Sequence, residues 1–235
     1  MIAIINDWLF SLTLLYSINT LANSTLITVI GTAVDHQTKQ PLYQEHHQLN
    51  INQLTQLPIT DTVKYYGPND QLLAKKTVNY KLPKTPSIEF IDYRLNYQQR
   101  SQVIDNTIII TEKVENKIIT STQTLLDKNT IVDAGFDSMI KLNWQPLTQG
   151  KAIKFRFIAL FNGKSYGFLA KKIQQTETTV SFRLALDNML LRWIADPIEV
   201  TYNKQTKRLL RYQGISNLLK NPDENYVVDI SYTYQ

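Results

Sequence analysis

The sequence predicts a mainly β protein: an antiparallel curved sheet, half-barrel or barrel, with one short helix packed on it. Three observations support this fold class. Isoleucine, threonine, valine and leucine dominate, and 13 of the 235 residues are tyrosine, a composition that favours pleated sheet. Short alternating runs are separated by turn sequences such as Gly67-Pro68-Asn69-Asp70 and Asn162-Gly163, which favour hairpins. Only one stretch, residues 135–143, has apolar residues at clear helical spacing.

The composition excludes several functional classes. The chain has no cysteine, so disulfides, thiol nucleophiles and cysteine–zinc sites are ruled out. Its net charge is +5, but the basic residues are dispersed and lack a nucleic-acid-binding signature, so we expect no nucleic-acid partner. With 7 glycines and no phosphate-binding loop, we expect no nucleotide and no other cofactor.

An apolar run near the N-terminus, residues 8–21, is followed by the small residues Ala22-Asn23-Ser24. It is shorter than the about 20 apolar residues of a spanning helix and is typical of a secretory signal. The residues before it contain no lysine or arginine and include Asp7, which instead favours an uncleaved anchor or a buried first helix. We predict a signal peptide over residues 1–24, an exported, periplasmic protein, and a single β domain over residues 25–235.

The first strands are expected to form consecutive hairpins. The strand over residues 87–97 has an unusual face: Asp92 and Arg94 are expected on the same face as the apolar Ile88 and Phe90. This pattern indicates either a β-bulge or a charged pair that points inward. Lys76 interrupts another apolar face, which predicts a position near a sheet margin. The strands expected in this half are 25–34, 41–49, 63–66, 71–82, 87–97, 100–104, 107–114 and 117–122.

The predicted helix, residues 135–143, carries Phe136, Met139 and Ile140 at helical spacing, and Pro146 is expected to end it. Asp133 and Asp137 lie at its start. Two carboxylates four residues apart could form an acid/base pair, but acidic residues there more often cap the helix and complement its dipole. We expect capping. The strands expected afterwards are 152–161, 166–173, 178–186, 198–202, 207–214 and 226–234, with a helical turn at 189–194.

The leading site candidate lies on the second strand. Side chains alternate across a strand, so Tyr43, Glu45 and His47 share one face and His46 lies on the other. A histidine beside a carboxylate can act as a general base or a metal ligand, with Asp92 or His36 as a further ligand. Because the chain has only 3 histidines, we predict a polar cluster that orients the strand or a ligand, and no metal site. The ligand-binding candidates are Tyr43, Glu45, His47, Asp92 and Arg94.

Four short motifs resemble a family of uncharacterised exported proteins of proteobacteria: Gly31-Thr32-Ala33, residues 42–47, Tyr65-Tyr66-Gly67 and residues 133–137. The resemblance covers most of the chain after residue 24 and implies no known activity. The succession of antiparallel strands with a short packed helix is also similar to periplasmic half-barrels that carry lipid or lipoprotein, an analogy of fold alone.

We therefore expect a soluble periplasmic protein that binds a lipid-like or other apolar small molecule, or that maintains the cell envelope with an envelope protein as partner. The absence of a recognisable catalytic motif favours binding over catalysis. One alternative is an envelope-directed hydrolase that uses Glu45 and His47 with Asp92 or Arg94. A second is an outer-membrane β-barrel, for which the alternation of Val228, Ile230, Tyr232 and Tyr234 is suitable.

Overall fold

The computed structural model describes residues 24–160, 163–187, 197–221 and 224–235. The predicted signal peptide, apart from Ser24, and the predicted helical turn at 189–194 lie outside the described residues. Among the helices that are described, none is long and apolar enough to cross a membrane.

One sheet of fifteen strands organises the described chain, and its order along the sheet falls into two arms. In the first arm, each strand pairs antiparallel with the next. Its strands are β1 (Ser24–Asp35), β2 (Pro41–Asn52), β3 (Pro58–Tyr66), β4 (Leu72–Asn79), β5 (Ser87–Asp92), β6 (Tyr97–Ile104), β7 (Thr107–Val114) and β8 (Lys117–Leu125).

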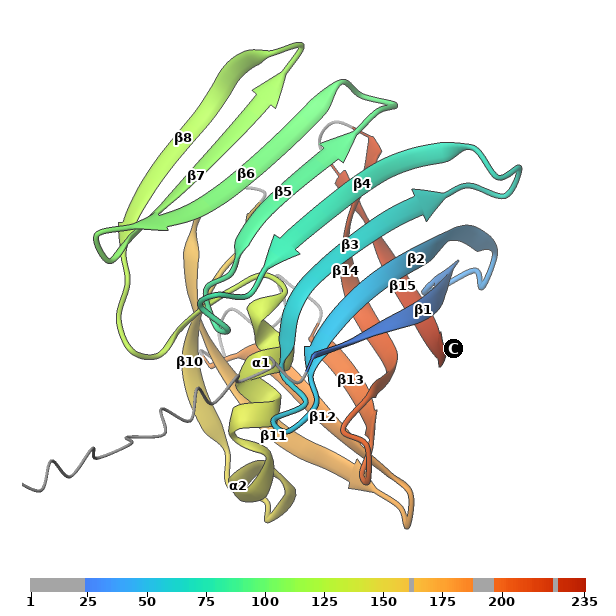
Figure 1. Cartoon of the computed structure of the whole chain (residues 1–235), viewed down its shortest axis with the longest axis vertical. Coiled ribbons are helices and arrows are strands. Elements are labelled where there is room, and N and C mark those ends of the chain that lie inside the picture. The colour runs from blue at the N-terminus through green and yellow to red at the C-terminus, as the bar shows by residue number, and fades with distance from the viewer. Residues whose placement is uncertain (1–23, 161–162, 188–196, 222–223) are drawn as a thin grey trace, which may run out of the picture.

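The second arm runs in the same manner from β10 to β15 and then joins the first, because β15 pairs antiparallel with β1. The arms therefore meet in the middle of the sheet (Figure 1), and the strand order places β8 and β9 at its two edges. The strands of this arm are β9 (Thr130–Val132), β10 (Ile153–Ile158), β11 (Ser165–Gln175), β12 (Thr179–Leu186), β13 (Ile198–Asn203), β14 (Leu209–Asn221) and β15 (Glu224–Tyr234).

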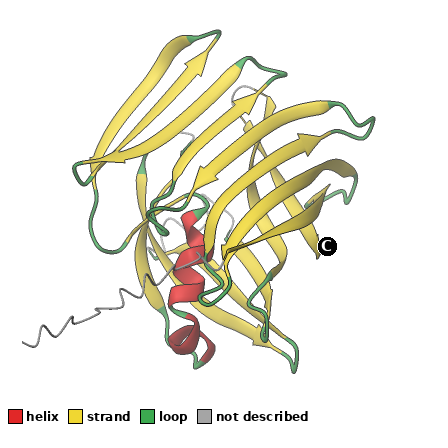
Figure 2. Ribbon diagram, viewed as in Figure 1, coloured by secondary structure: helices red, strands yellow, loops and turns green. Residues whose placement is uncertain are grey.

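Two short helices, α1 (Gly135–Leu142) and α2 (Trp144–Thr148), connect β9 to β10. These two strands are parallel, and a parallel pair requires a crossover of this kind. The helices, red in Figure 2, pack on the second arm: Met139, Ile140 and Leu147 share one apolar core with Phe182 and Tyr202. Gly135 fixes the start of α1, since a Cβ there would lie 2.1 Å from the carbonyl oxygen of Lys84.

The predicted fold class is confirmed, as is the short helix near residues 135–143. The expectation that Pro146 ends the helical region is wrong, because Pro146 lies in the first turn of α2. There its missing N–H group removes no hydrogen bond within the helix.

The strand predicted over residues 87–97 is interrupted. β5 ends at Asp92, residues 93–96 form a turn, and β6 begins at Tyr97. The carboxylate of Asp92 accepts the backbone N–H of Arg94 at 3.0 Å, and Asn96 has a positive φ of 47°; both features are typical of turns. Of the predicted inward pair, only Asp92 is buried; Arg94 lies in the turn, is exposed, and bonds to Asp92 from there.

Candidate functional site

The predicted face of β2 is confirmed. Tyr43, Glu45 and His47 all point to the inner side of the sheet, the side that carries the buried side chains. His46 lies on the other face, where the centroid of its ring is 4.7 Å from that of Tyr66 and the two rings are tilted by 58°. The local alternation of the strand is enough to separate the two histidines.

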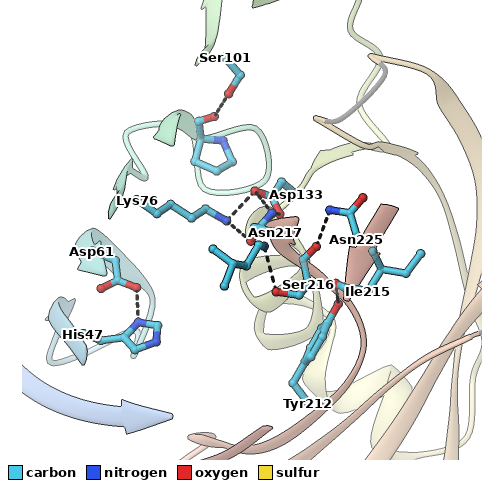
Figure 3. A network of polar contacts seen from close by, with 12 residues as sticks. His47, Asp61, Lys76, Ser101, Asp133, Tyr212, Ile215, Ser216, Asn217 and Asn225 are labelled. Atoms are coloured by element: carbon cyan, nitrogen blue, oxygen red, sulfur yellow. Dashed lines mark hydrogen bonds and ion pairs between the residues drawn. The ribbon is translucent and has the colours of Figure 1, made fainter. Parts of the chain in front are cut away.

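His47 is held between two carboxylates. Its Nδ1 atom lies 2.8 Å from Asp61 Oδ2 (Figure 3), and its Nε2 atom lies 3.2 Å from Glu45 Oε2. The hydroxyl of Tyr232, on β15, also donates to Glu45 Oε2, at 3.0 Å. The cluster therefore spans β2, β3 and β15. Asp61 is a site residue that sequence reasoning missed, although it shares the parity of Val63 and Tyr65.

The environment of His47 sets its protonation. Burial alone would lower its pKa, but the charges and hydrogen bonds of Asp61 and Glu45 outweigh burial and raise the pKa to about 10. At neutral pH the ring is therefore an imidazolium that donates from both nitrogens. No cluster of three or more metal-ligating side chains occurs among the described residues.

A second polar cluster joins both arms to the start of α1. The buried Lys76 Nζ atom, on β4, donates to Asp133 Oδ2 at 2.6 Å and to Asn217 Oδ1, on β14, at 2.8 Å. Figure 3 shows these three side chains converging. The expectation that Lys76 lies near a sheet margin is wrong, because β4 is an inner strand and the ammonium group finds its partners inside.

The two helix-start candidates do not cap α1. The N-cap residue is Ala134, whose side chain can make no capping hydrogen bond. Asp133 lies one residue before it and is engaged by Lys76 and Asn217. Asp137 lies in the first turn, as expected, and its carboxylate pairs with Lys141 at 2.8 Å and accepts the hydroxyl of Tyr202 at 3.0 Å. Asp133 has a positive φ of 39°, a backbone conformation that its surroundings must stabilise.

A cavity of about 170 Å³ lies between these clusters. The structure brings four of the predicted residues together in its wall, Glu45, His47, Asp133 and Asp137. The other three lie elsewhere. Tyr43 is buried with its hydroxyl 2.6 Å from Ser216 Oγ; Arg94 donates to Asp92 at 2.9 Å and to the carbonyl of Leu219 at 2.7 Å.

The remaining wall comes from both arms and from α1. It mixes apolar and phenolic side chains with a few charged groups, as small-molecule sites do. These further lining residues include Val29, Leu49, Asp61, Val63, Tyr65, Lys76, Val78, Tyr80, Phe136, Lys141, Tyr212, Ile230, Tyr232 and Tyr234.

No protein-family model matches the chain, and no curated protein matches it. One solved structure with a similar fold is a crystal structure from Brucella abortus, a β-barrel-like protein of the domain of unknown function DUF1849. The two are 7% identical, the match covers 90% of this chain and 95% of that chain, and the TM-score is 0.41. The resemblance to exported proteins and to lipid carriers stays a prediction.

Proposed function

We propose that this protein is a binding protein that holds a small molecule in the cavity between β1–β4, β14, β15 and α1. The observation that carries the proposal is the cavity itself, about 170 Å³ in volume, with apolar side chains and fixed charged groups in one wall. Its polar groups are already oriented by one another before any ligand arrives. Such preorganisation lowers the cost of binding.

The same geometry favours binding over hydrolysis. A general base needs a free lone pair within hydrogen-bonding reach of its substrate. Both ring nitrogens of His47 are engaged by carboxylates, and neither Asp92 nor Arg94 lines the cavity.

The size of the cavity limits its ligand. Its volume is close to that of the cavity of about 150 Å³ that accepts benzene in an engineered protein. An apolar molecule of this size would fit as a whole, whereas a lipid-like ligand would place only one end inside. We therefore propose a compact ligand with an apolar body.

The proposal includes the exported location that the apolar segment at residues 8–21 suggests. Expression of the full chain in a bacterium, followed by fractionation and mass measurement of the periplasmic product, tests it. We expect a chain shortened near residue 24. A full-length product confined to the cytoplasm would contradict this part of the proposal.

Native mass spectrometry of the gently purified protein tests binding directly. We expect a complex heavier than the chain alone, and loss of the added mass in Val63→Phe, which fills the cavity. Thr62→Phe is the matched control, since Thr62 is next to Val63 on β3 but points to the other face; it should keep the ligand. A wild-type chain without added mass, or a Val63→Phe chain that keeps it while folded by circular dichroism, would contradict the proposal.

A further inference from the structure

The cavity has a charge opposite in sign to that of the whole protein. Four carboxylates and three cationic side chains line it, so with His47 protonated its net charge is −1, whereas the chain carries +5. The carboxylates are Glu45, Asp61, Asp133 and Asp137, and the cations are His47, Lys76 and Lys141.

The excess negative charge lies on one side of the cavity. Lys76 pairs with Asp133, and Lys141 pairs with Asp137, so these charges balance one to one. Glu45 and Asp61 instead share the single cation of His47. The excess charge therefore lies where β2 meets β3.

Unpartnered polar atoms occur in the same part of the wall. Asp61 Oδ1 is buried and has no hydrogen-bond partner within the described ranges. Tyr65 and Tyr80 are 3% and 8% exposed and both line the cavity, and the described residues provide no partner for either hydroxyl. A carboxylate oxygen can only accept a hydrogen bond, and a hydroxyl oxygen can also accept one. A ligand with several N–H donors would satisfy all three.

Aromatic rings complete this environment. Tyr65, Tyr80, Tyr232, Tyr234 and Phe136 line the cavity, and ring faces attract cations. Burial first, and then the charge of Glu45 for Tyr65 and of Asp61 for Tyr80, raises the pKa of both phenols well above its ordinary value. Both hydroxyls therefore stay neutral.

We infer that the cavity selects a compact organic cation, a protonated amine on a short apolar body, whose ammonium group lies beside Glu45 and Asp61. This inference rests on the proposed binding function and specifies its ligand class. The net charge of the wall disfavours an anion, and the cavity volume of about 170 Å³ suits an ion the size of benzylammonium, given the benzene-sized precedent.

Isothermal titration calorimetry with three probes of one shape tests the inference. Benzylammonium chloride, benzyl alcohol and sodium benzoate differ mainly in charge, and the titrations are made near pH 7. We expect saturable binding of benzylammonium, at least about tenfold weaker binding of benzyl alcohol, and no binding of benzoate, since a charge-assisted hydrogen bond in a buried site is worth this much.

Variants locate the ammonium group. Asp61→Asn should weaken benzylammonium binding by about tenfold or more, and Tyr80→Phe by about threefold. Glu112→Gln is the matched control: Glu112 is also a buried carboxylate with one unpartnered oxygen, but it lies outside the cavity wall, so binding should be unchanged. Asp61→Asn removes a charged partner of His47 and could therefore prevent folding. Tyr80→Phe tests the inference in that case.

The outcomes separate this inference from the proposed function. If benzyl alcohol or benzoate binds as tightly as benzylammonium, and Val63→Phe abolishes that binding, the binding function stands and the selectivity for cations is wrong. Unchanged benzylammonium affinity in Asp61→Asn and Tyr80→Phe would also overturn the inference. If no probe binds and the purified protein carries no added mass, both proposals fail.

Discussion

Two parts of the inner face of the sheet bury different kinds of side chain: one part buries apolar groups, and the other buries charged groups. Where α1 and α2 cover β12 and β13, the face is apolar and completely closed: its side chains are 0% exposed. Where β2, β3 and β4 face β14 and β15, the face carries charged groups that are almost as deeply buried. The closed face consists of Val180, Phe182, Leu184, Val200 and Tyr202, and the charged face includes Glu45, Asp61 and Lys76.

The contribution of each part to the stability of the fold differs, and stability alone explains only the apolar part. Burial of a large apolar side chain contributes about 1.5–3 kcal/mol. A buried ion pair often contributes no more than an apolar replacement of the same size, because removing charges from water is costly. The charged half is therefore not the arrangement expected from packing alone, which is typical of a functional site.

The largest effect is expected in the apolar half. Phe182→Ala should lower the free energy of unfolding by about 3–5 kcal/mol, since it leaves a cavity in a closed core. Urea unfolding followed by circular dichroism measures this. Ser181→Ala, on the opposite face of β12, is the control and should cost less than about 1.5 kcal/mol, the worth of its hydrogen bond to Thr201. A loss below about 1 kcal/mol in Phe182→Ala would contradict the assignment of this half as the stabilising core.

A slightly smaller effect is expected for one partner of the buried ion pair. Lys76→Met should cost about 3 kcal/mol, because it leaves Asp133 without its cation, and the double variant Lys76→Met, Asp133→Leu should recover most of that loss. Lys220→Met is the control, since the Lys220–Glu224 pair is exposed by more than half, 53% and 54%, and should contribute less than about 1 kcal/mol. A double variant as unstable as Lys76→Met would show that the charged half is needed for stability.

The smallest effect is a dependence of stability on pH. The pKa of His47 is raised in the folded protein from 6.5 to about 10, so its contribution is fully present below about pH 6.5 and is lost as the pH rises toward 10. We expect a loss of about 2–3 kcal/mol over this range, reduced from the full shift by relaxation and water penetration.

Urea midpoints of the wild type and of His47→Gln, compared between about pH 6 and pH 10, isolate this contribution. The difference between the two proteins should shrink as the pH rises. A constant difference would mean that His47 does not change its charge in this range.

Local patterns in the sequence predicted the fold class, the helix and the shared face of Tyr43, Glu45 and His47. They succeed because the alternation of a strand and the period of a helix are properties of neighbouring residues. The sequence did not predict which residues these side chains contact. Asp61 meets His47 only through the register of β2 against β3, and Lys76 meets Asp133 and Asn217, which are 57 and 141 residues away.

Asp92 and Arg94 show a different limit. Asp92 points inward as its strand position predicted, but Arg94 lies in an exposed turn. Arg94 donates to Asp92 and to the carbonyl of Leu219, and neither residue lines the cavity. Asp133 failed as a cap for a related reason: a capping motif is local, whereas its buried cationic partner belongs to a distant strand. The sequence therefore predicts faces better than it predicts which faces meet.

The pairing of β1 with β15 has a consequence for folding kinetics. Within the first arm, neighbouring antiparallel strands are joined by short connections and can form early. The junction of the arms instead closes a loop of about two hundred residues: Thr233 donates to the carbonyl of Ile30 across 203 positions. Such non-local pairing is slow. Since Glu45 and Tyr232 meet only across that junction, the cavity should be completed in a late step, and folding intermediates should lack the proposed binding site.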